Sequence, residues 1–484
     1  MKVLLRSALL AACGITVAAC STEPPVALKT SEMPPAFVAP VAPNAQVWPS
    51  TDWWTGFSSP ELTTLETTAQ QSNLDLAAAA ARVIQARGNT GIAASALFPA
   101  VDLSASGQRG GSKVPLSQSG TVDASGNTFG LSLNASYELD FWGLAQDNLR
   151  AARNSARSAI YAQRVVALTV TADVADTYLD VLALRERIAI AKQNLGAAKR
   201  ILTITEAKVT NGVSSNLELA QQRAIVAAVE ATIPNLEEQE REARYALAVL
   251  EGRIPEGFDV TAQSLEGVVA PVVAPGMPAE LLVRRPDIAG AEADLRAAHA
   301  NVDAARAAFL PAIGLTGSGG YASSAISSLI NPSSLAWTIG ASLLQTVFDG
   351  GAKTSQLDVN KGRETELVAD YRHTVFNALS DVESSLGQVA SLADQQRFTT
   401  AQVNAAAEAF RISELQYREG VADLLAVLQT QQTLFTAQDT LVQIKLARLQ
   451  SNISLYRALG GGWSVDQDKD APTRNEFNPL PIPL

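Results

Sequence analysis

The sequence contains almost none of the side chains that build metal centres and thiol-based active sites. Its 484 residues include two cysteines, Cys13 and Cys20, and two histidines, His299 and His373. Because both cysteines lie near the N-terminus, the rest of the chain has no disulfide and no cysteine ligand or nucleophile. The histidines stand in separate helical stretches without a neighbouring ligand motif. We therefore expect no metal site, no cofactor and no catalytic residue.

Positive charge is also scarce. Charged residues make up 18% of the chain and the formal net charge is −11, which argues against a nucleic-acid partner. Hydrophobic residues reach 47%, but alanine supplies much of that share. This composition favours long, closely packed helices over a large spherical core.

The first twenty residues, MKVLLRSALLAACGITVAAC, resemble a bacterial lipoprotein signal. Lys2 and Arg6 precede an apolar run too short to span a bilayer, and small residues then lead to Cys20. In such a signal the final cysteine is acylated and becomes the mature N-terminus. Cleavage before Cys13 instead would leave about six apolar residues after Arg6, fewer than the usual ~7–15.

We therefore predict a signal peptide at residues 1–19, lipidation at Cys20, and a tether at residues 20–59 that is rich in proline and alanine. Ser21 follows the cysteine, which in the lipoprotein sorting pattern of many Gram-negative bacteria implies the cell outer membrane. An ordinary secretory signal with an incidental cysteine is the alternative.

The rest of the chain is an internal duplication. Residues 79–100, AAARVIQARGNTGIAASALFPA, align with residues 291–312, AEADLRAAHANVDAARAAFLPA, and Gly212 later aligns with Gly420. The order helix, strand, loop, strand, long helix, tight turn, returning helix occurs twice. We assign a first repeat to residues 60–251, a linker to 252–280, a second repeat to 281–462 and a tail to 463–484.

The long helices carry an apolar residue at every seventh position. These residues are Val174, Val181, Ile188, Leu195 and Leu202 in the first repeat, and Leu428, Phe435, Val442, Leu449 and Tyr456 in the second. Such spacing places one seam against a neighbouring helix, as in coiled coils. The uninterrupted stretch 143–211 would reach ~100 Å as one helix. It predicts a tube or a stalk.

Each repeat also contains two predicted strands. In LNASYELDFWG, residues 133–143, apolar side chains alternate with a polar set that comprises Ser132, Asn134, Ser136, Glu138 and Asp140. A half-buried soluble sheet gives the same alternation, but the preceding signal favours membrane strands, which need ~9–11 residues to cross a bilayer. The polar set would then face a water-filled lumen. The predicted strands lie near 101–109, 129–141, 313–321 and 337–348.

Four strands cannot close a membrane barrel, because the smallest bacterial barrels use about eight. An open sheet edge in lipid would leave backbone amides unpaired. The barrel must therefore be assembled from several chains, and three chains would supply about twelve strands.

Five motifs follow in an order that resembles the TolC-like outer-membrane efflux proteins, and most closely their NodT/OprM-type lipoprotein branch. The motifs are YELDFWG (137–143), LLVRRPDIAGAEADLRAAHANVDAARAAFLP (281–311), ALSDVESSL (378–386), YREGVADLLAVL (417–428) and LYRALGGGW (455–463). The resemblance covers residues 47–463. It implies a mainly α fold with a membrane β-barrel part, in which a homotrimeric twelve-stranded barrel continues into a periplasmic α-helical barrel. It also implies a periplasmic adaptor and an inner-membrane pump of the resistance–nodulation–division (RND) class as partners, and a mixed belt formed by residues 252–279 and 463–484.

The same resemblance places the turns Gly212–Val213 and Gly420–Val421 at the periplasmic aperture. Asp423 follows the second turn, and three copies around an axis would form an acidic ring that favours cations. Some relatives have aspartates further along, where this chain has Ala426 and Gln429. The gating role of Asp423 therefore stays open.

Other conspicuous residues have a structural interpretation. In RRPDI, Pro286 suits the first position of a helix. The negative charge of Asp287 is favourable beside the positive end of the helix dipole. GGGW at 460–463 follows a helix and lacks the Lys-Ser/Thr of a phosphate loop, so it predicts a helix stop. A further group, Asp173, Asp176 and Asp180, shares one helical face that either lines the lumen or faces solvent.

The function predicted by these features is a passive exit duct of a tripartite efflux system, which exports small molecules such as drugs across the outer membrane. A duct for metal efflux or protein secretion is the alternative of the same class. A structural coiled-coil lipoprotein that bridges the envelope is a third hypothesis, but such a bridge needs no membrane strands.

Overall fold

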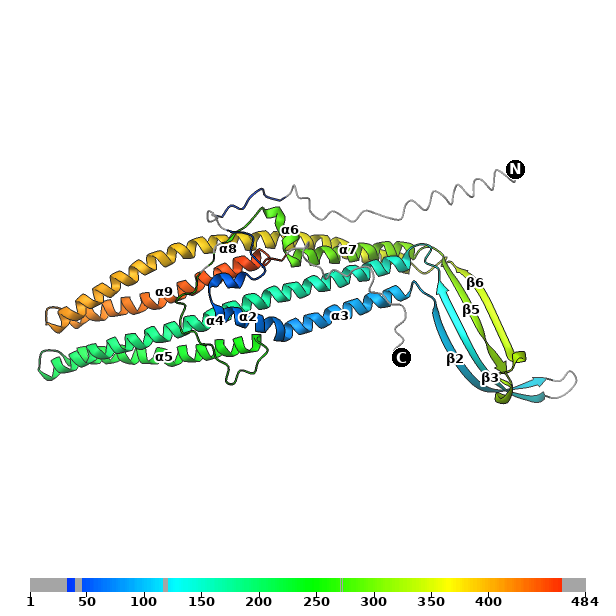
Figure 1. The fold of residues 1–484 in the computed structure, drawn as a ribbon, viewed down its shortest axis with the longest axis horizontal. Helices are drawn as coiled ribbons and strands as arrows, with labels where there is room; N and C mark the ends of the chain where they lie inside the picture. Colours follow the sequence, from blue (N-terminus) through cyan, green and yellow to red (C-terminus); the bar gives the residue numbers. More distant parts are fainter. Residues whose placement is uncertain (1–32, 40–45, 116–120, 270, 272, 464–484) are drawn as a thin grey trace.

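The chain folds into a long helical body with a four-stranded sheet at one end (Figure 1). This computed structural model describes residues 33–39, 46–115, 121–269, 271 and 273–463. Cys20, the signal 1–19 and the tail beyond residue 463 lie outside the described residues.

The predicted duplication is visible in helices of matching length. The first repeat contains α3 (Leu74–Ser95, 22 residues), α4 (Leu144–Thr210, 67 residues) and α5 (Asn216–Leu250, 35 residues). The second contains α7 (Pro286–Ala307, 22 residues), α8 (Ala352–Arg418, 67 residues) and α9 (Leu424–Ala458, 35 residues). Short α2 (Pro60–Ser72) and α6 (Leu281–Arg284) precede the two sets. Each long helix and its shorter partner form a hairpin (Figure 1).

Glycine and capping residues set the ends of these helices. Gly143 and Gly351 precede α4 and α8 with φ of 85° and 92°, a left-handed conformation that a side chain disfavours. Asn73 separates α2 from α3, and its Oδ1 accepts hydrogen bonds from the first amides of α3. Pro286 occupies the first turn of α7 as predicted, and three glycines with positive φ follow α9. The prediction of a helix stop at GGGW is thereby confirmed.

The sheet has the order β2-β3-β5-β6, with every neighbouring pair antiparallel. The strands are β2 (Ala100–Pro115), β3 (Thr121–Glu138), β5 (Ala312–Ser323) and β6 (Leu335–Leu344). Within the described residues, β2 and β6 each pair on one side alone. The sheet therefore has two open edges.

The strand boundaries correct the sequence prediction. The stretch predicted as a loop between residues 109 and 129 is largely a hairpin, in which β2 pairs with β3 as far as Pro115 opposite Thr121. Pairing is a backbone interaction, so glycine, serine and asparagine can extend a hairpin without an apolar pattern. At the other end β3 stops at Glu138 and β6 at Leu344, so both strands end before the predicted residues 141 and 348.

The largest hydrophobic core lies midway along the helical body. Val174 and Val181 of the seven-residue pattern are fully buried there, together with Tyr178, whereas Ile188 and Leu202 nearer the hairpin ends are half-buried. The linker packs against this core through Phe258, Val260 and Leu265, and its β4 (Val273–Ala274) pairs with β1 (Gln46–Val47). Among the described residues, no helix has an apolar segment long enough to cross a bilayer.

Candidate functional site

The two faces of the sheet differ sharply in chemistry. One face carries large apolar side chains that are exposed in the single chain, among them Leu103, Leu133, Trp337, Ile339 and Leu343. Ile339 is 81% exposed and Trp337 72%. A protein in water rarely leaves so continuous an apolar surface uncovered. This face therefore has the composition of a surface that contacts lipid or another apolar partner.

The opposite face carries the predicted polar set. Ser104 Oγ and Ser132 Oγ lie 2.8 Å apart, and Asn134 Nδ2 donates to Ser104 Oγ over 3.1 Å. Ser136 and Glu138 continue the same alternation along β3. These hydroxyl and amide groups form a hydrophilic surface that suits contact with water.

Asp140 does not belong to this surface as a strand residue. It lies beyond the end of β3, and its two carboxylate oxygens accept hydrogen bonds from Ala145 N and Gln146 N, each over 2.9 Å. The carboxylate thereby caps the N-terminus of α4, where the helix dipole favours negative charge. The prediction that Asp140 is a strand residue is wrong, because β3 ends at Glu138 and the amides at the start of α4 hold the Asp140 side chain; that it faces the lumen stays a prediction.

An aromatic pair reinforces this junction between sheet and helices. The rings of Phe141 and Trp142 meet edge to face at 4.8 Å, and Trp142 Nε1 donates to Pro311 O over 2.7 Å. Pro311 immediately precedes β5 in the second repeat. The indole therefore joins the two repeats at the place where strands pass into helices.

The far ends of the hairpins contain the predicted turn residues. Gly212 and Gly420 have φ of 72° and 80°, and the neighbouring Val213 and Val421 are 73% and 78% exposed. We call residues 211–215 and 419–423 the tip. Asp423 is the N-cap of α9, since its Oδ1 accepts a hydrogen bond from Ala426 N over 3.0 Å.

Contacts between the two hairpins converge on Tyr417, which the sequence analysis did not single out. The hydroxyl of Tyr417 lies 3.1 Å from Thr205 Oγ1, and Lys208 Nζ lies 4.3 Å above its ring and donates to its carbonyl oxygen. Further from the tip, Arg187 on α4 binds Asp439 on α9 with two hydrogen bonds of 2.7 and 3.2 Å. These polar contacts hold α4 against the second hairpin.

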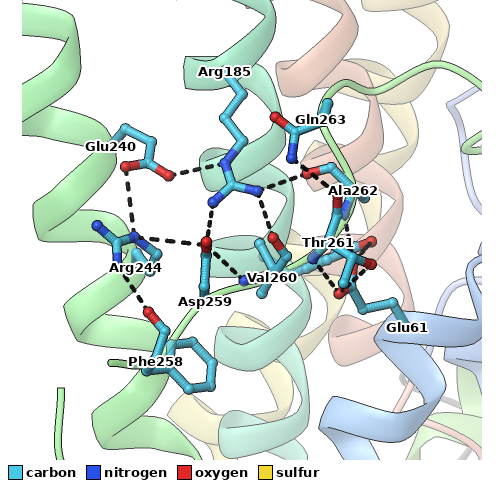
Figure 2. Close-up of polar contacts among 11 residues, drawn as sticks. Glu61, Arg185, Glu240, Arg244, Phe258, Asp259, Val260, Thr261, Ala262 and Gln263 are labelled. Atoms are coloured by element: carbon cyan, nitrogen blue, oxygen red, sulfur yellow. Dashed lines mark hydrogen bonds and ion pairs between the residues drawn. The ribbon is translucent and has the colours of Figure 1, made fainter. Parts of the chain in front are cut away.

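Arg185 binds the first part of the predicted belt, the linker 252–280, to the helices (Figure 2). From here on, the belt means this linker alone. From α4, Arg185 Nε donates to Glu240 of α5 over 2.9 Å. Its Nη1 donates to the carbonyl oxygens of Val260 and Ala262 over 2.6 and 2.9 Å, and its Nη2 bonds Asp259. Burial acts to raise the pKa of Asp259, but the hydrogen bond and charge of Arg185 hold it below its usual range.

Glu61 at the start of α2 anchors the same segment from the other side (Figure 2). Its Oε1 accepts hydrogen bonds from Thr261 N over 2.6 Å and from Thr261 Oγ1 over 2.9 Å, and its Oε2 accepts one from Ala262 N over 3.1 Å. The segment 259–262 is therefore held between a cation on α4 and a carboxylate on α2. The sequence gives no periodic signal for such contacts.

The aspartates of α4 lie between α4 and α9. Asp180 Oδ1 accepts a hydrogen bond from Gln450 Nε2 over 3.0 Å. Burial, with the nearby charge of Asp180, raises the pKa of Asp176 to about 7, although Arg457 lowers it in part. The three side chains are half-buried in the single chain. They therefore do not form a fully solvent-exposed face.

Two other predicted features have structural explanations. Arg285 Nη2 binds Asp287 over 2.8 Å, and its Nη1 donates to Asp381 on α8 and to Ala458 O at the end of α9. RRPDI is thus a helix start that also joins three helices. His299 Nδ1 lies 2.7 Å from Glu364, and no group of three or more potential metal ligands occurs within the part of the chain that the structure describes.

Comparison with known proteins assigns the chain to a family. A family model for outer membrane efflux proteins matches residues 65–253 and 277–461, so the chain belongs to the outer membrane efflux protein family. It is an outer-membrane efflux channel, and the predicted family, fold class and outer-membrane location are confirmed.

The relatives and solved structures agree with this assignment. The chain is 39% identical to the pyoverdine export outer membrane protein OpmQ of Pseudomonas putida, over 95% of this chain and 97% of that protein. It is 31% identical to the cation efflux system protein CusC of Escherichia coli K12, over 85% and 88%. The outer-membrane channel OprN superposes with a TM-score of 0.83 at 27% identity, over 92% of this chain and 100% of that chain. An open state of the MtrE channel of Neisseria gonorrhoeae gives a TM-score of 0.80 at 28% identity.

Proposed function

We propose that three copies of the chain form one passive export duct, which has no catalytic step and spans the outer membrane through a shared twelve-stranded barrel. The observation that carries this proposal is the sheet, which combines two open edges, one apolar exposed face and one polar face. In lipid, each unpaired backbone group at an open edge costs several kcal/mol. Joining β2 of one copy to β6 of the next removes every edge.

The tip is the surface we assign to a periplasmic adaptor, which links the duct to an inner-membrane pump of the RND class. Support comes from the exposed Val213 and Val421, which are apolar side chains held out on tight turns. In this arrangement the three copies of Asp423 face one another across the aperture. The pump supplies the energy of transport, and the duct supplies a path.

For the cargo we propose small organic molecules. Two relatives at 39% identity export pyoverdine, and a solvent efflux pump protein of Pseudomonas putida is 30% identical over 90% of this chain. The cation efflux protein CusC is 31% identical, which keeps metal ions as a second candidate cargo. Export assays with pyoverdine and with a series of metal-cation salts separate the two.

We also propose that Cys20 is acylated and fixes the N-terminus in the inner leaflet of the outer membrane. The amides of Val38 and Ala39 donate to the two carboxylate oxygens of Glu383, over 2.7 and 2.9 Å, midway along α8. Glu383 lies about 47 Å along α8 from its start near the sheet, at ~1.5 Å per residue. The tether from Cys20 to Val38 can extend to about 60 Å, so it is long enough to reach the membrane.

Native mass spectrometry of the full chain, extracted in mild detergent, tests the assembly and the anchor together. We expect a trimer that carries three acyl-modified N-termini, and Cys20→Ser should give a trimer of unmodified chains. A stable monomer that retains its strands in bilayers would contradict the trimer. Acylation at Cys13 would contradict the anchor alone.

A further inference from the structure

Two glutamates are buried where α2 meets the end of α5, outside every surface described above. Glu66 on α2 is 0% exposed, and Glu251, the residue that ends α5, is 1% exposed. Both carboxylate oxygens of Glu66 and Oε1 of Glu251 have no hydrogen-bond partner among the described residues. Buried carboxyl groups normally have such partners, and Glu66 lacks them at both of its carboxylate oxygens.

The backbone holds these two elements in close contact. Asn73 Nδ2, directly after α2, donates to Leu250 O at the end of α5 over 2.8 Å. Gly252 has φ of 67°, and a Cβ at this position would lie 2.2 Å from Ser72 O. We call this contact, residues 66–76 with 247–253, the corner. The corner cannot separate the two carboxyl groups without breaking its own packing.

The surrounding charges do not neutralise the pair. Besides burial, the charge of Glu251 raises the pKa of Glu66, and the charge of Arg253 lowers that of Glu251 without offsetting its burial. Glu61 on α2 is engaged by the belt, and Tyr178 of α4, which packs against α2, contacts Ser59 and Glu61. Burial, reinforced by Glu251, raises the pKa of Glu66 to about 9, and burial raises the pKa of Glu251 to about 7.

We propose that Glu66 and Glu251 form a proton-operated latch, which holds α2 and the α2–α3 junction against the end of α5 while the carboxyl groups are protonated and weakens as they ionise. Ionisation would place one and then two mutually repelling negative charges in a buried site, where Glu66 has no hydrogen-bond donor. Local opening of the corner would return these charges to water. The latch therefore couples proton concentration to the mobility of the belt, and this role is independent of the export path.

The direction of the pH effect follows from proton linkage. A carboxyl whose pKa is raised in the closed corner binds its proton more tightly there than in the open corner. The corner is then most stable when the pH is below the ordinary glutamate pKa of 4.5. Its stability falls as the pH rises from that value towards the raised pKa. Each such group changes the opening equilibrium by up to about tenfold per pH unit within that window.

Hydrogen exchange of the full-length trimer in detergent tests the latch. Exchange at residues 66–76 and 247–253 is measured from pH 5.5 to 8.5. The rates are corrected for the pH dependence of the intrinsic amide exchange rate. We expect protection in the corner to fall at least tenfold across this range in the wild type. Glu66→Gln should remove most of that slope, and Glu251→Gln should flatten the part below about pH 7. The readout is the pH dependence of protection and not its absolute level, because the buried side-chain amide of the new glutamine can itself change the absolute level.

Glu256→Gln is the matched control, because Glu256 is an exposed glutamate just beyond the corner. The pH dependence of corner protection in this variant should equal that of the wild type. Protection that does not change with pH in the wild type would overturn the proposal, as would an unchanged slope in both glutamine variants. Addition of CaCl2 at pH 8.5 provides a second check. If calcium restores protection in the wild type and fails to do so in Glu66→Gln, the pair binds a cation and the proton latch is wrong.

Discussion

Asp423 combines two roles that a substitution can separate. As N-cap of α9 its oxygen accepts a hydrogen bond from a helix amide, and in the proposed trimer its charge contributes to the potential of the aperture. Asparagine caps a helix about as well as aspartate but carries no charge. The two variants Asp423→Asn and Asp423→Ala therefore report on different properties of one residue.

In planar bilayers, we expect Asp423→Asn to lower cation selectivity and weaken block by multivalent cations, with thermal stability unchanged. Asp423→Ala should show the same electrical change and lose ~1 kcal/mol of stability from the missing cap. The differences from the wild type in selectivity and cation block should shrink as the salt concentration rises, because the electrostatic screening length becomes shorter. Identical selectivity of Asp423→Asn and the wild type would leave Asp423 with the capping role alone.

At the scale of secondary-structure elements, the Arg185 guanidinium makes several of the polar contacts that hold the belt. Arg185 is 12% exposed and its partner Glu240 14%, and its bonds reach α5 and three belt residues. Loss of the cation would leave the mostly buried Glu240 with the longer Arg244 contact of 3.6 Å, and two carbonyl groups without their donor.

We expect Arg185→Ala to cost about 2–3 kcal/mol, and to expose the belt to limited proteolysis between residues 252 and 280. Lys192→Ala serves as the control, because the Lys192–Glu237 pair is 57% and 48% exposed and such pairs contribute less than about 1 kcal/mol. A belt in Arg185→Ala that resists protease as well as the belt in Lys192→Ala would show that the apolar contacts of Phe258 and Leu265 suffice.

The sheet makes a second prediction at this scale, from two adjacent residues of β3. Leu133 lies on the apolar face and Ser132 on the polar face. In a membrane barrel, Leu133→Arg should cost ~2–4 kcal/mol near the bilayer midplane. Ser132→Arg should insert normally and alter conductance. Urea titration of the proteins in vesicles, together with single-channel recording, distinguishes these outcomes; equal stability of the two variants would argue against a lipid-facing Leu133.

The elements also show where sequence reasoning succeeds and where it stops. The seven-residue apolar pattern and the glycines predicted a helix over 143–211, and α4 occupies Leu144–Thr210, because these signals are local. Strand ends were less accurate, since β2 and β3 extend through polar residues that pair by backbone alone. The partners of Arg185, Arg187 and Tyr417 could not be predicted, because no periodicity specifies which polar groups meet across separations that run from 55 to 252 residues of chain.

At the scale of the whole molecule, contacts of α4 with α9 contribute to holding the two hairpins together, beside those of α4 with Tyr417. Arg187 and Asp439 supply a two-bond ion pair, with the side chains 23% and 39% exposed. We expect Arg187→Ala to cost ~1 kcal/mol of global stability, because the pair is partly solvated. The same change should let the hairpins separate more often near the tip.

Single-channel recording measures this separation as longer or more frequent open states. The double variant Arg187→Ala/Asp439→Ala should open no more than either single variant if the two residues act through each other. Additive effects of the two substitutions would mean that each residue acts through other partners. Lys199→Ala is a suitable control, because its pair with Glu230 is exposed and joins α4 to α5 within one hairpin.

The equal lengths of the paired helices, 67 and 35 residues in both repeats, have a consequence for stoichiometry. In a trimer the six hairpins end at one level and form a nearly sixfold rim. A partner that recognises backbone shape and the positive-φ turns would find six equivalent positions. A partner that recognises side chains would find three, because Asp423 caps one kind of hairpin and Ser215 the other. The ratio of bound partner to duct therefore reports which of these two features is recognised.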